Sequence, residues 1–216
     1  MKTLHLEKKG IRGLSISESF AKQDKYSVLA GVVMSNEFQI DGFVFGHATL
    51  LGDDITEQII TMYENLNRDD ITYVLLPGTI LSMYNIVDIE KIYEQLQIPI
   101  IAVNSQDSSG LHDTIKHHFP DNFEIKLKQY EKLGSRETIQ LRTQNKIFLR
   151  MRGCTTEHCK TLLDKIILQG TILNLCVFLR FLQKLFLKQI LYNEISFILY
   201  KLFGSGSEIA AISALV

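Results

Sequence analysis

Three strand-like segments follow one another near the start of the chain with only short polar turns between them, and this run constrains the fold more than any other feature. The segments cover residues 14–20, 26–34 and 38–50, and they are rich in apolar and β-branched residues. The middle segment is almost wholly apolar, which predicts a central strand buried on both faces. Because short turns join antiparallel neighbours, the sequence predicts an antiparallel meander.

Helices and buried strands alternate after this meander. The predicted helices are residues 54–65, 88–95, 111–118, 122–133 and 155–168, and the predicted strands are residues 71–76, 98–103, 138–141 and 146–151. The strands at 71–76 and 98–103 alternate with helices, and such strands pair in parallel through right-handed crossovers. The strand-like pieces at 138–141 and 146–151 belong to a mixed tail. The sequence therefore predicts an α/β fold of the ribonuclease H-like kind, a mixed sheet of a three-strand antiparallel meander plus parallel strands, with helices on both faces.

Two acidic residues, Asp53 and Asp54, open the first predicted helix. Either can serve as its N-cap, and Glu57 stands three residues after Asp54, as in a capping box. Asp88 is expected to cap the next helix. Residues 77–85, which lie before that helix, are expected to form a loop or a broken turn.

Length and composition predict one large domain over residues 1–170 with an apolar helical extension over residues 171–216. Of the 216 residues, 46% are hydrophobic and 22% are charged, which is the balance of a globular protein. The formal net charge of −1 argues against polyanion binding by the whole surface but allows a local basic groove. Three cysteines without paired spacing favour a reducing cytoplasm, and no signal peptide is visible.

The C-terminal part is apolar, and its charges are spaced as in an amphipathic helix. No charged residue stands between residues 166 and 179, a run shorter than the roughly 18–20 residues that a membrane span needs. Arg180, Lys184 and Lys188 then recur at helical spacing. We therefore expect no membrane span, and a helix that packs on the domain or on a partner, with a homo-oligomer as one form of partner. A helix on a membrane surface is the alternative.

Glu18 and Asp54 are the carboxylates that the predicted fold brings to one edge of the sheet. Glu18 lies near the end of the first strand, and Asp54 opens the helix after the third. In phosphodiesterases, carboxylates from separate elements hold Mg²⁺ or Mn²⁺, which polarises the phosphate and activates a water. The sequence thus predicts a metal-binding and catalytic site at Glu18 and Asp54. The alternatives are a solvent-facing strand residue for Glu18 and a simple helix cap for Asp54.

Four further residues are candidates for a supporting role at this site. Asp41 is otherwise a turn acid, Asp53 shares the ambiguity of Asp54, and Asp88 is otherwise a helix cap. His117 ends a predicted helix, where it could contact a phosphate, donate a proton or interact with the helix C-terminus.

Basic residues gather in the second half of the chain and could line a groove for a phosphate backbone. They are Lys126, Lys128, Lys132, Arg136, Arg142, Lys146, Arg150 and Arg152. Lys126 and Arg142 are our candidates for nucleic-acid binding. Because glutamates are interspersed among them, an ordinary solvated surface is the alternative. The sequence holds no Walker-type phosphate loop, no dinucleotide-binding glycine motif and no serine nucleophile elbow.

Several longer motifs together resemble the archaeal endonuclease dU family. They are KKGIRGLSISESF, SVLAGVVM, IDGFVFGHATLLGDDITEQII, YNIVDIEKIYE, PIIAV, HHFP and LLDKIILQG. The resemblance covers residues 8–170, and the combination of motifs is specific. It implies a ribonuclease H-like core related to endonuclease V. It also implies a metal-dependent endonuclease that acts in DNA repair, cleaving DNA near deoxyuridine, a deaminated base.

The chain departs from the family pattern at several places. The family has a carboxylate pair at the end of the first strand, where this chain has Ser17 and Glu18, and its acidic helix start matches Asp54. Many members have Leu-Asp-Gly after the fourth strand, whereas this chain has Pro77, which cannot bind a metal. The apolar residues 171–216 also differ from the family ending. Three hypotheses follow: the endonuclease just described, a catalytically impaired nuclease-like module that binds nucleic acid or a protein, or a membrane-peripheral or oligomerising protein whose C-terminal amphipathic helix sets its location.

Overall fold

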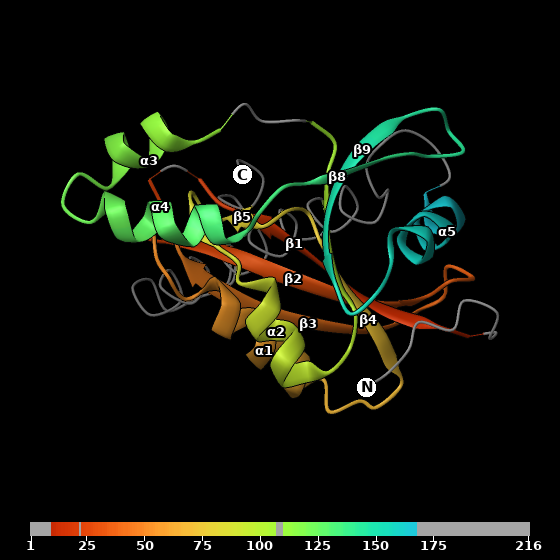
Figure 1. Ribbon diagram of the computed structural model, residues 1–216. Helices are drawn as coiled ribbons and strands as arrows, with labels where there is room; N and C mark the ends of the chain where they lie inside the picture. Colours follow the sequence, from red (N-terminus) through yellow and green to blue (C-terminus); the bar gives the residue numbers. More distant parts are fainter. Residues whose placement is uncertain (1–9, 22, 107–109, 168–216) are drawn as a thin grey trace, which may run out of the picture. The chain divides into compact units, whose positions relative to one another are not determined.

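The computed structural model describes residues 10–21, 23–106 and 110–167, all of which belong to the compact unit Met1–Arg180 (Figure 1). The predicted extension over residues 171–216, with its amphipathic helix and its contact between copies, lies outside the described residues. Among the residues that are described, no helix is long and apolar enough to cross a membrane.

A mixed sheet of seven strands forms the centre of the described part (Figure 1). Its strands are β1 (Arg12–Ser19), β2 (Tyr26–Ser35), β3 (Ile40–Thr49), β4 (Ile71–Leu76), β7 (Ile100–Asn104), β8 (Glu137–Gln140) and β9 (Lys146–Arg152). Their order in space is β3-β2-β1-β4-β7-β9-β8. β1 pairs in parallel with β4, and β4 with β7, whereas the other neighbours are antiparallel. The predicted meander and the predicted parallel strands are both present.

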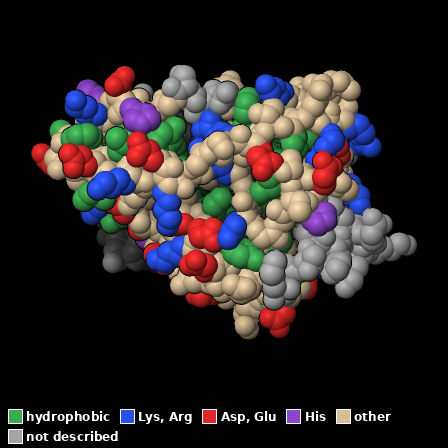
Figure 2. All heavy atoms as spheres, viewed as in Figure 1, with side chains coloured by type: hydrophobic (Ala, Val, Ile, Leu, Met, Phe, Trp, Pro, Cys, Tyr) green, Lys and Arg blue, Asp and Glu red, His purple; other side chains and the backbone are tan. Residues whose placement is uncertain are grey.

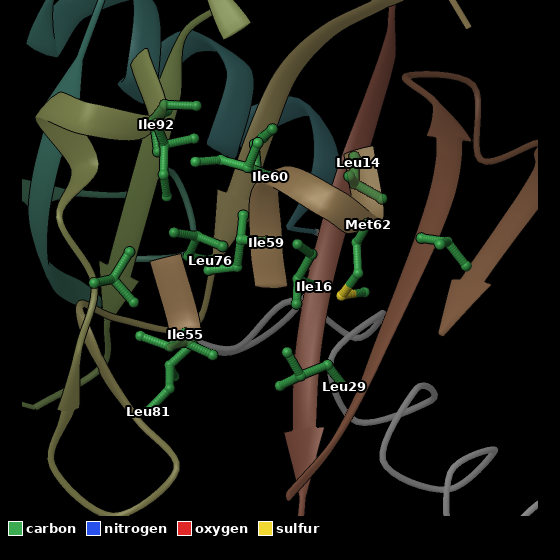
Figure 3. Packing of buried hydrophobic residues seen from close by; sticks show 14 of the residues in the cluster. Leu14, Ile16, Leu29, Ile55, Ile59, Ile60, Met62, Leu76, Leu81 and Ile92 are labelled. Atoms are coloured by element: carbon green, nitrogen blue, oxygen red, sulfur yellow. The ribbon is translucent and has the colours of Figure 1, made fainter. Parts of the chain in front are cut away.

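Helices cover both faces of this sheet. They are α1 (Ile55–Asn65), α2 (Ile89–Leu96), α3 (His112–His118), α4 (Phe123–Lys132) and α5 (Thr156–Ile166). The apolar residues of α1 and α2 join the core on one face, and those of α5 join the core on the other. Figure 3 shows Ile59 and Met62 of α1 packed toward Leu14 and Ile16 of β1. Each predicted helix and strand is found within about two residues of its predicted ends, the usual scatter of such boundaries.

The glycine inside β3 at position 46 is needed for this packing. A Cβ atom built there would lie 2.8 Å from the Met62 sulfur, so α1 can approach the strand only because the side chain is absent. The same strand carries a bulge at Asp41, since Val33 pairs with Gly42 while Met34 pairs with Ile40.

The segment predicted as a loop over residues 77–85 contains a small hairpin instead. β5 (Ile80–Leu81) pairs antiparallel with β6 (Asn85–Ile86). The three residues between them, Ser82, Met83 and Tyr84, have φ values of 46°, 55° and 67°. Non-glycine residues avoid this left-handed region, so nothing in the local sequence indicates such a turn. Contacts with residues that are distant in the sequence hold the turn in this conformation.

Candidate functional site

The C-terminal ends of several strands meet at one edge of the sheet. β1, β3, β4 and β7 all run in the same direction, because β1 is antiparallel to β2 and β2 is antiparallel to β3. Glu18 is the last residue but one of β1, and the five residues after β3 lead to Asp54. The fold thus brings the two predicted site carboxylates to the same edge. Ligand sites of α/β proteins commonly lie at this edge.

Glu18 is held by the tip of the β5–β6 hairpin. Its Oε2 atom accepts hydrogen bonds from the backbone N–H of Ser82 at 2.6 Å and from the Ser82 hydroxyl at 3.1 Å. The Ser82 hydroxyl also lies 2.5 Å from the hydroxyl of Ser27 on β2. Ser82 is fully buried, whereas Glu18 is half-buried. The carboxylate therefore has a fixed position rather than a mobile surface one.

Asp54 is enclosed by hydrogen-bond donors from two elements. It accepts from the Thr49 N–H at 3.1 Å, from the Thr49 hydroxyl at 2.8 Å and from the Asn85 side-chain amide at 2.7 Å. Burial works to raise the pKa of this carboxyl, but the hydrogen bonds from Thr49 and Asn85 together outweigh it. The pKa of Asp54 therefore lies below its usual value of 3.8.

Asp54 stands at the N-cap position of α1, as predicted, but the expected capping by its side chain is wrong. The Asp54 side chain makes no cap hydrogen bond, because it turns back to Thr49. Asn85 accepts from the N–H of Ile55 instead, at 3.3 Å. Glu57, the expected partner of a capping box, forms an ion pair with Lys91 of α2. The predicted cap of α2 is confirmed, since Asp88 accepts from the Lys91 N–H at 3.1 Å.

Glu18 and Asp54 are therefore linked through one hairpin, which holds Glu18 at Ser82 and Asp54 at Asn85. Their oxygen atoms are hard donors, the type that Mg²⁺ prefers, and this ion often takes only one or two carboxylates and completes its shell with water and substrate phosphates. Within the described ranges, no group of three or more His, Cys, Asp or Glu residues is placed to hold a metal ion. The donor type fits a divalent metal, with two protein carboxylates rather than three.

Asp53, next to Asp54, has a different partner. Its Oδ1 atom lies 2.6 Å from the ammonium of Lys126 on α4, which also donates to the Gly52 carbonyl at 2.5 Å. The Lys126 side chain is almost fully buried and stacks against Phe119, with its ammonium 4.9 Å from the ring centre. Lys126, predicted to bind nucleic acid, thus anchors the segment that leads into α1.

Asp88 and Asp53 line a cleft of about 410 Å³ between α4 and the starts of α1 and α2. Its charged side chains are mixed in sign, and several of them pair: Lys132 contacts Asp88 at 2.7 Å, and Arg152 contacts Glu90 at 2.8 Å. Figure 2 shows acidic and basic side chains interleaved in this region between α4 and α2. This pairing gives the cleft no strong preference for an anion or a cation.

Asp41 lies at the opposite end of the sheet from Glu18. It is level with the first residues of β1, where it accepts from Arg12 at 2.5 Å and from Arg68 at 2.9 Å. The hydrogen bond from Arg12 is the main reason why the pKa of Asp41 lies below its usual value. Asp70 completes this ion-pair network. The structure does not bring Asp41 to the edge that carries Glu18.

The remaining candidates occupy exposed positions. His117 at the end of α3 packs edge-on against His118, which itself stacks on Tyr84 of the hairpin with ring centres 4.9 Å apart. Arg142 lies in the turn between β8 and β9, where its backbone N–H donates to Asp164 of α5 at 2.6 Å. The histidine pair is thus connected to the hairpin that holds Glu18, whereas Arg142 contacts the opposite helical layer.

Ser17 and Pro77 are the two positions at which the chain departs from the pattern that the family resemblance implies. Ser17 is buried and points to the face opposite Glu18, because neighbouring strand residues alternate. Pro77 follows the end of β4, and Gly78 after it has a φ of 128°. A Cβ atom at Gly78 would lie 2.9 Å from the Asn104 side chain, so the chain turns tightly against the end of β7. No carboxylate occupies this turn.

Three residues that hold the site were not predicted from the sequence, namely Thr49, Ser82 and Asn85. All three are small polar residues whose partners lie 5 to 64 positions away. Their side chains are ordinary turn and loop types, and only the fold gives them a carboxylate to bind.

The sequence profile of the endonuclease dU family matches residues 9–174 of the chain. A UPF0215 protein of Pyrobaculum calidifontis is 29% identical over 141 residues, which cover 65% of this chain and 77% of that protein. A UPF0215 protein of Archaeoglobus fulgidus is 25% identical over 162 residues, which cover 74% of this chain and 84% of that protein.

Solved structures share the fold. The crystal structure of a protein of unknown function from Archaeoglobus fulgidus has a TM-score of 0.66 at 22% identity, covering 78% of this chain and 95% of that one. Endonuclease V of Ciona intestinalis, in complex with a 24mer DNA containing an inosine followed by a ribo-adenosine, has a TM-score of 0.55 at 13% identity, covering 86% and 89%. These similarities confirm the predicted ribonuclease H-like fold and its relation to endonuclease V.

Proposed function

Because the chain belongs to the endonuclease dU family, we propose that it is a metal-dependent endonuclease that cleaves DNA at deoxyuridine and so acts in DNA repair. The family and the fold support nuclease activity in general. The family description and one structural neighbour, which holds DNA with an inosine, support the proposed substrate. Inosine and deoxyuridine both arise when a base loses an amino group. We place this activity in the cytoplasm.

The observation that carries the proposal is the attachment of Glu18 and Asp54 to one hairpin at one sheet edge. These two carboxylates would hold Mg²⁺ or Mn²⁺. When bound, such an ion polarises a phosphodiester and lowers the pKa of a water. Asp54 already accepts hydrogen bonds on both oxygens, so it would have to exchange one of them for the metal. Ser82 fixes Glu18, and the low pKa of Asp54 keeps that carboxylate ionised near neutral pH.

A nicking assay tests the proposal. Purified protein is incubated with a supercoiled plasmid or a labelled duplex that contains one deoxyuridine, in Mg²⁺, Mn²⁺ or EDTA, with a thymidine duplex beside it. We expect metal-dependent nicking of the deoxyuridine duplex that falls at least about 100-fold in Glu18→Gln, because the variant loses one of two proposed ligands of an ion that contributes several kcal/mol of transition-state stabilisation. Glu64→Gln, an exposed acid at the end of α1, is the matched control. Nicking that persists in EDTA, or in Glu18→Gln, would contradict the proposal.

A second function, binding without cleavage, is favoured by a specific observation. The described residues hold no group of three metal-binding side chains, and the turn after β4 has Pro77 where the family resemblance implies an acid. In that case the protein binds the duplex but does not nick it in any metal. Pro77→Asp then tests the missing acid directly, since it should create nicking activity. Failure of both the wild type and Pro77→Asp to nick, with DNA still bound, would leave binding as the function.

A further inference from the structure

Arg150 lies on the same face of the sheet as Glu18. Ile16 of β1, Leu76 of β4, Ala102 of β7 and Arg150 of β9 follow one another across the sheet, and the first three belong to the core under α1 and α2. Glu18 is the next residue of β1 on this face. Three strand spacings of about 4.8 Å separate β1 from β9, or roughly 14 Å. The long Arg150 side chain extends across part of this distance toward the β5–β6 hairpin.

The guanidinium of Arg150 is buried and contacts only neutral groups. Arg150 is 8% exposed. It donates to the Gly134 carbonyl at 2.8 and 3.3 Å and to the Thr79 hydroxyl at 3.0 Å. Burial lowers the pKa of Arg150, and the nearby Arg136 lowers it further. Within the described residues, each of these acceptors is neutral, and no carboxylate lines the pocket around Arg150.

A buried cation that lacks an anionic partner is costly, because water and neutral acceptors must compensate its charge. Here the cost is increased by a second guanidinium in the same cavity. The cavity has a volume of about 290 Å³ and is lined by residues from α4, the loop after it, β8 and β9: Tyr130, Ser135, Arg136, Thr138, Phe148 and Arg150. None of its lining residues is acidic. Such a set of donors is suited to an anion with several oxygen atoms.

Thr79 connects this cavity to the proposed catalytic edge. It follows the tight turn at Pro77 and Gly78, and three residues later Ser82 binds Glu18. The same loop therefore contacts Arg150 at one end and Glu18 at the other. An anion in the cavity would lie beside the edge where a phosphodiester would be cut.

We infer that the cavity at Arg150 and Arg136 binds one phosphate group of the nucleic-acid backbone, a short distance along the strand from the phosphodiester held at Glu18. Guanidinium groups bind phosphate oxygens through paired hydrogen bonds. This inference rests on the proposed function insofar as the ligand is nucleic acid. The site positions the strand and does not touch the scissile bond.

The test measures binding without cleavage. The affinity of a fluorescent deoxyuridine duplex is determined in EDTA over a range of salt concentrations. We expect Arg150→Gln to bind at least about 10-fold more weakly, with a salt slope reduced by about 1, the loss of one phosphate contact. Lys160→Gln removes the same charge from α5, on the opposite face of the sheet, and should bind within about 2-fold of wild type. Thermal unfolding shows whether each variant is folded.

Two further measurements keep the test decisive if Arg150→Gln does not fold. Arg136→Gln, in the half-buried second arginine, should show the same loss of affinity and slope. Inorganic phosphate should raise the melting temperature of the wild-type protein more than that of Arg136→Gln at equal ionic strength, because the general stabilising effect of phosphate is the same for both proteins. Folded variants that bind DNA as tightly as wild type, with an unchanged slope, would overturn the inference, as would an equal effect of phosphate on the melting temperatures of the wild type and Arg136→Gln.

The outcome is separable from that of the nicking assay. Weak binding by Arg150→Gln with no nicking by the wild type would retain the phosphate site and reject hydrolysis. Nicking by the wild type with full binding by folded Arg150→Gln would retain hydrolysis and reject the phosphate site.

Discussion

Asp54 shows how a single carboxylate can join two elements. Its oxygens accept hydrogen bonds from Thr49 at the end of β3 and from Asn85 of the hairpin, while Asn85 caps the first N–H of α1. Loss of the carboxylate would leave the Thr49 N–H and hydroxyl without this acceptor, and the Asn85 amide would keep only its hydrogen bond to the Thr49 carbonyl. We expect Asp54→Ala to lower the free energy of unfolding by about 1–3 kcal/mol, the range for half-buried groups that lose a charged partner. Urea unfolding measures this, and Glu64→Ala on α1 should change little.

The low pKa of Asp54 predicts a pH dependence of stability. A carboxyl whose pKa is lower in the folded state stabilises the protein above its unfolded pKa, near 3.8, and loses this contribution as the pH falls through the folded value. We therefore expect the melting temperature to fall below about pH 4, and to fall less steeply in Asp54→Asn. Asp41 and Asp88 also have lowered pKa values, so the variant should keep part of the acid sensitivity. If the melting temperature falls equally steeply at acid pH in the wild type and in Asp54→Asn, Asp54 does not contribute to the pH dependence.

At the scale of the element, the β5–β6 hairpin connects the two carboxylates of the candidate site, Glu18 and Asp54. Its tip has three consecutive residues in the left-handed region, yet its Ser82 holds Glu18 and its Asn85 holds Asp54. The carbonyl of Ser82 also accepts from the N–H of Leu51 in the segment after β3. The contacts therefore offset a strained backbone. Strain of this kind is common where a functional side chain must be fixed.

The energetic cost of the left-handed backbone can be measured at Met83, whose φ is 55°. Glycine adopts this conformation without a steric cost, so Met83→Gly should raise the free energy of unfolding by about 1 kcal/mol relative to Met83→Ala. The alanine variant removes the same side chain but keeps the strained backbone, and it is the matched control. Equal stability of the two variants would show that the turn is relaxed in solution.

At the scale of the whole molecule, the charge is balanced rather than concentrated. The chain carries 23 basic and 24 acidic residues, and in the cleft beside α4 the two signs are paired. A surface of this kind provides little long-range attraction for a polyanion. DNA binding should therefore depend on a few close phosphate contacts.

The salt dependence of DNA binding tests this balance. Each neutralised phosphate contributes a slope of about 0.9 in a plot of log affinity against log salt. We expect a total slope of about 3 or less between roughly 50 and 200 mM salt, well below that of proteins with 6–10 phosphate contacts. Fluorescence anisotropy with a duplex that lacks deoxyuridine measures the non-specific part. A slope of about 6 or more would indicate a basic surface outside the described residues.

Sequence patterns identified the elements because their signals are local. Apolar period and turn residues predicted the meander, β4 and the N-cap at Asp88, and those features depend on residues close in the chain. The convergence of Glu18 and Asp54 at one edge also followed from strand order alone. The family resemblance, carried by motifs over most of the chain, added the nuclease interpretation.

The tertiary structure decided what those carboxylates contact. Asp54 was predicted to bind a metal, with helix capping as the alternative, and Lys126 to bind nucleic acid. The structure gives Asp54 hydrogen bonds from Thr49 and from the distant Asn85, and it pairs Lys126 with the distant Asp53 and Gly52. The hairpin could not be predicted, because the hydrogen bonds that stabilise its left-handed turn join residues up to 64 positions apart in the sequence. The same reason applies to Arg150, whose burial against Thr79 and Gly134 depends on the order of strands in the sheet. Periodicity within the chain determines which elements form, whereas contacts between remote segments determine which polar groups are buried and paired.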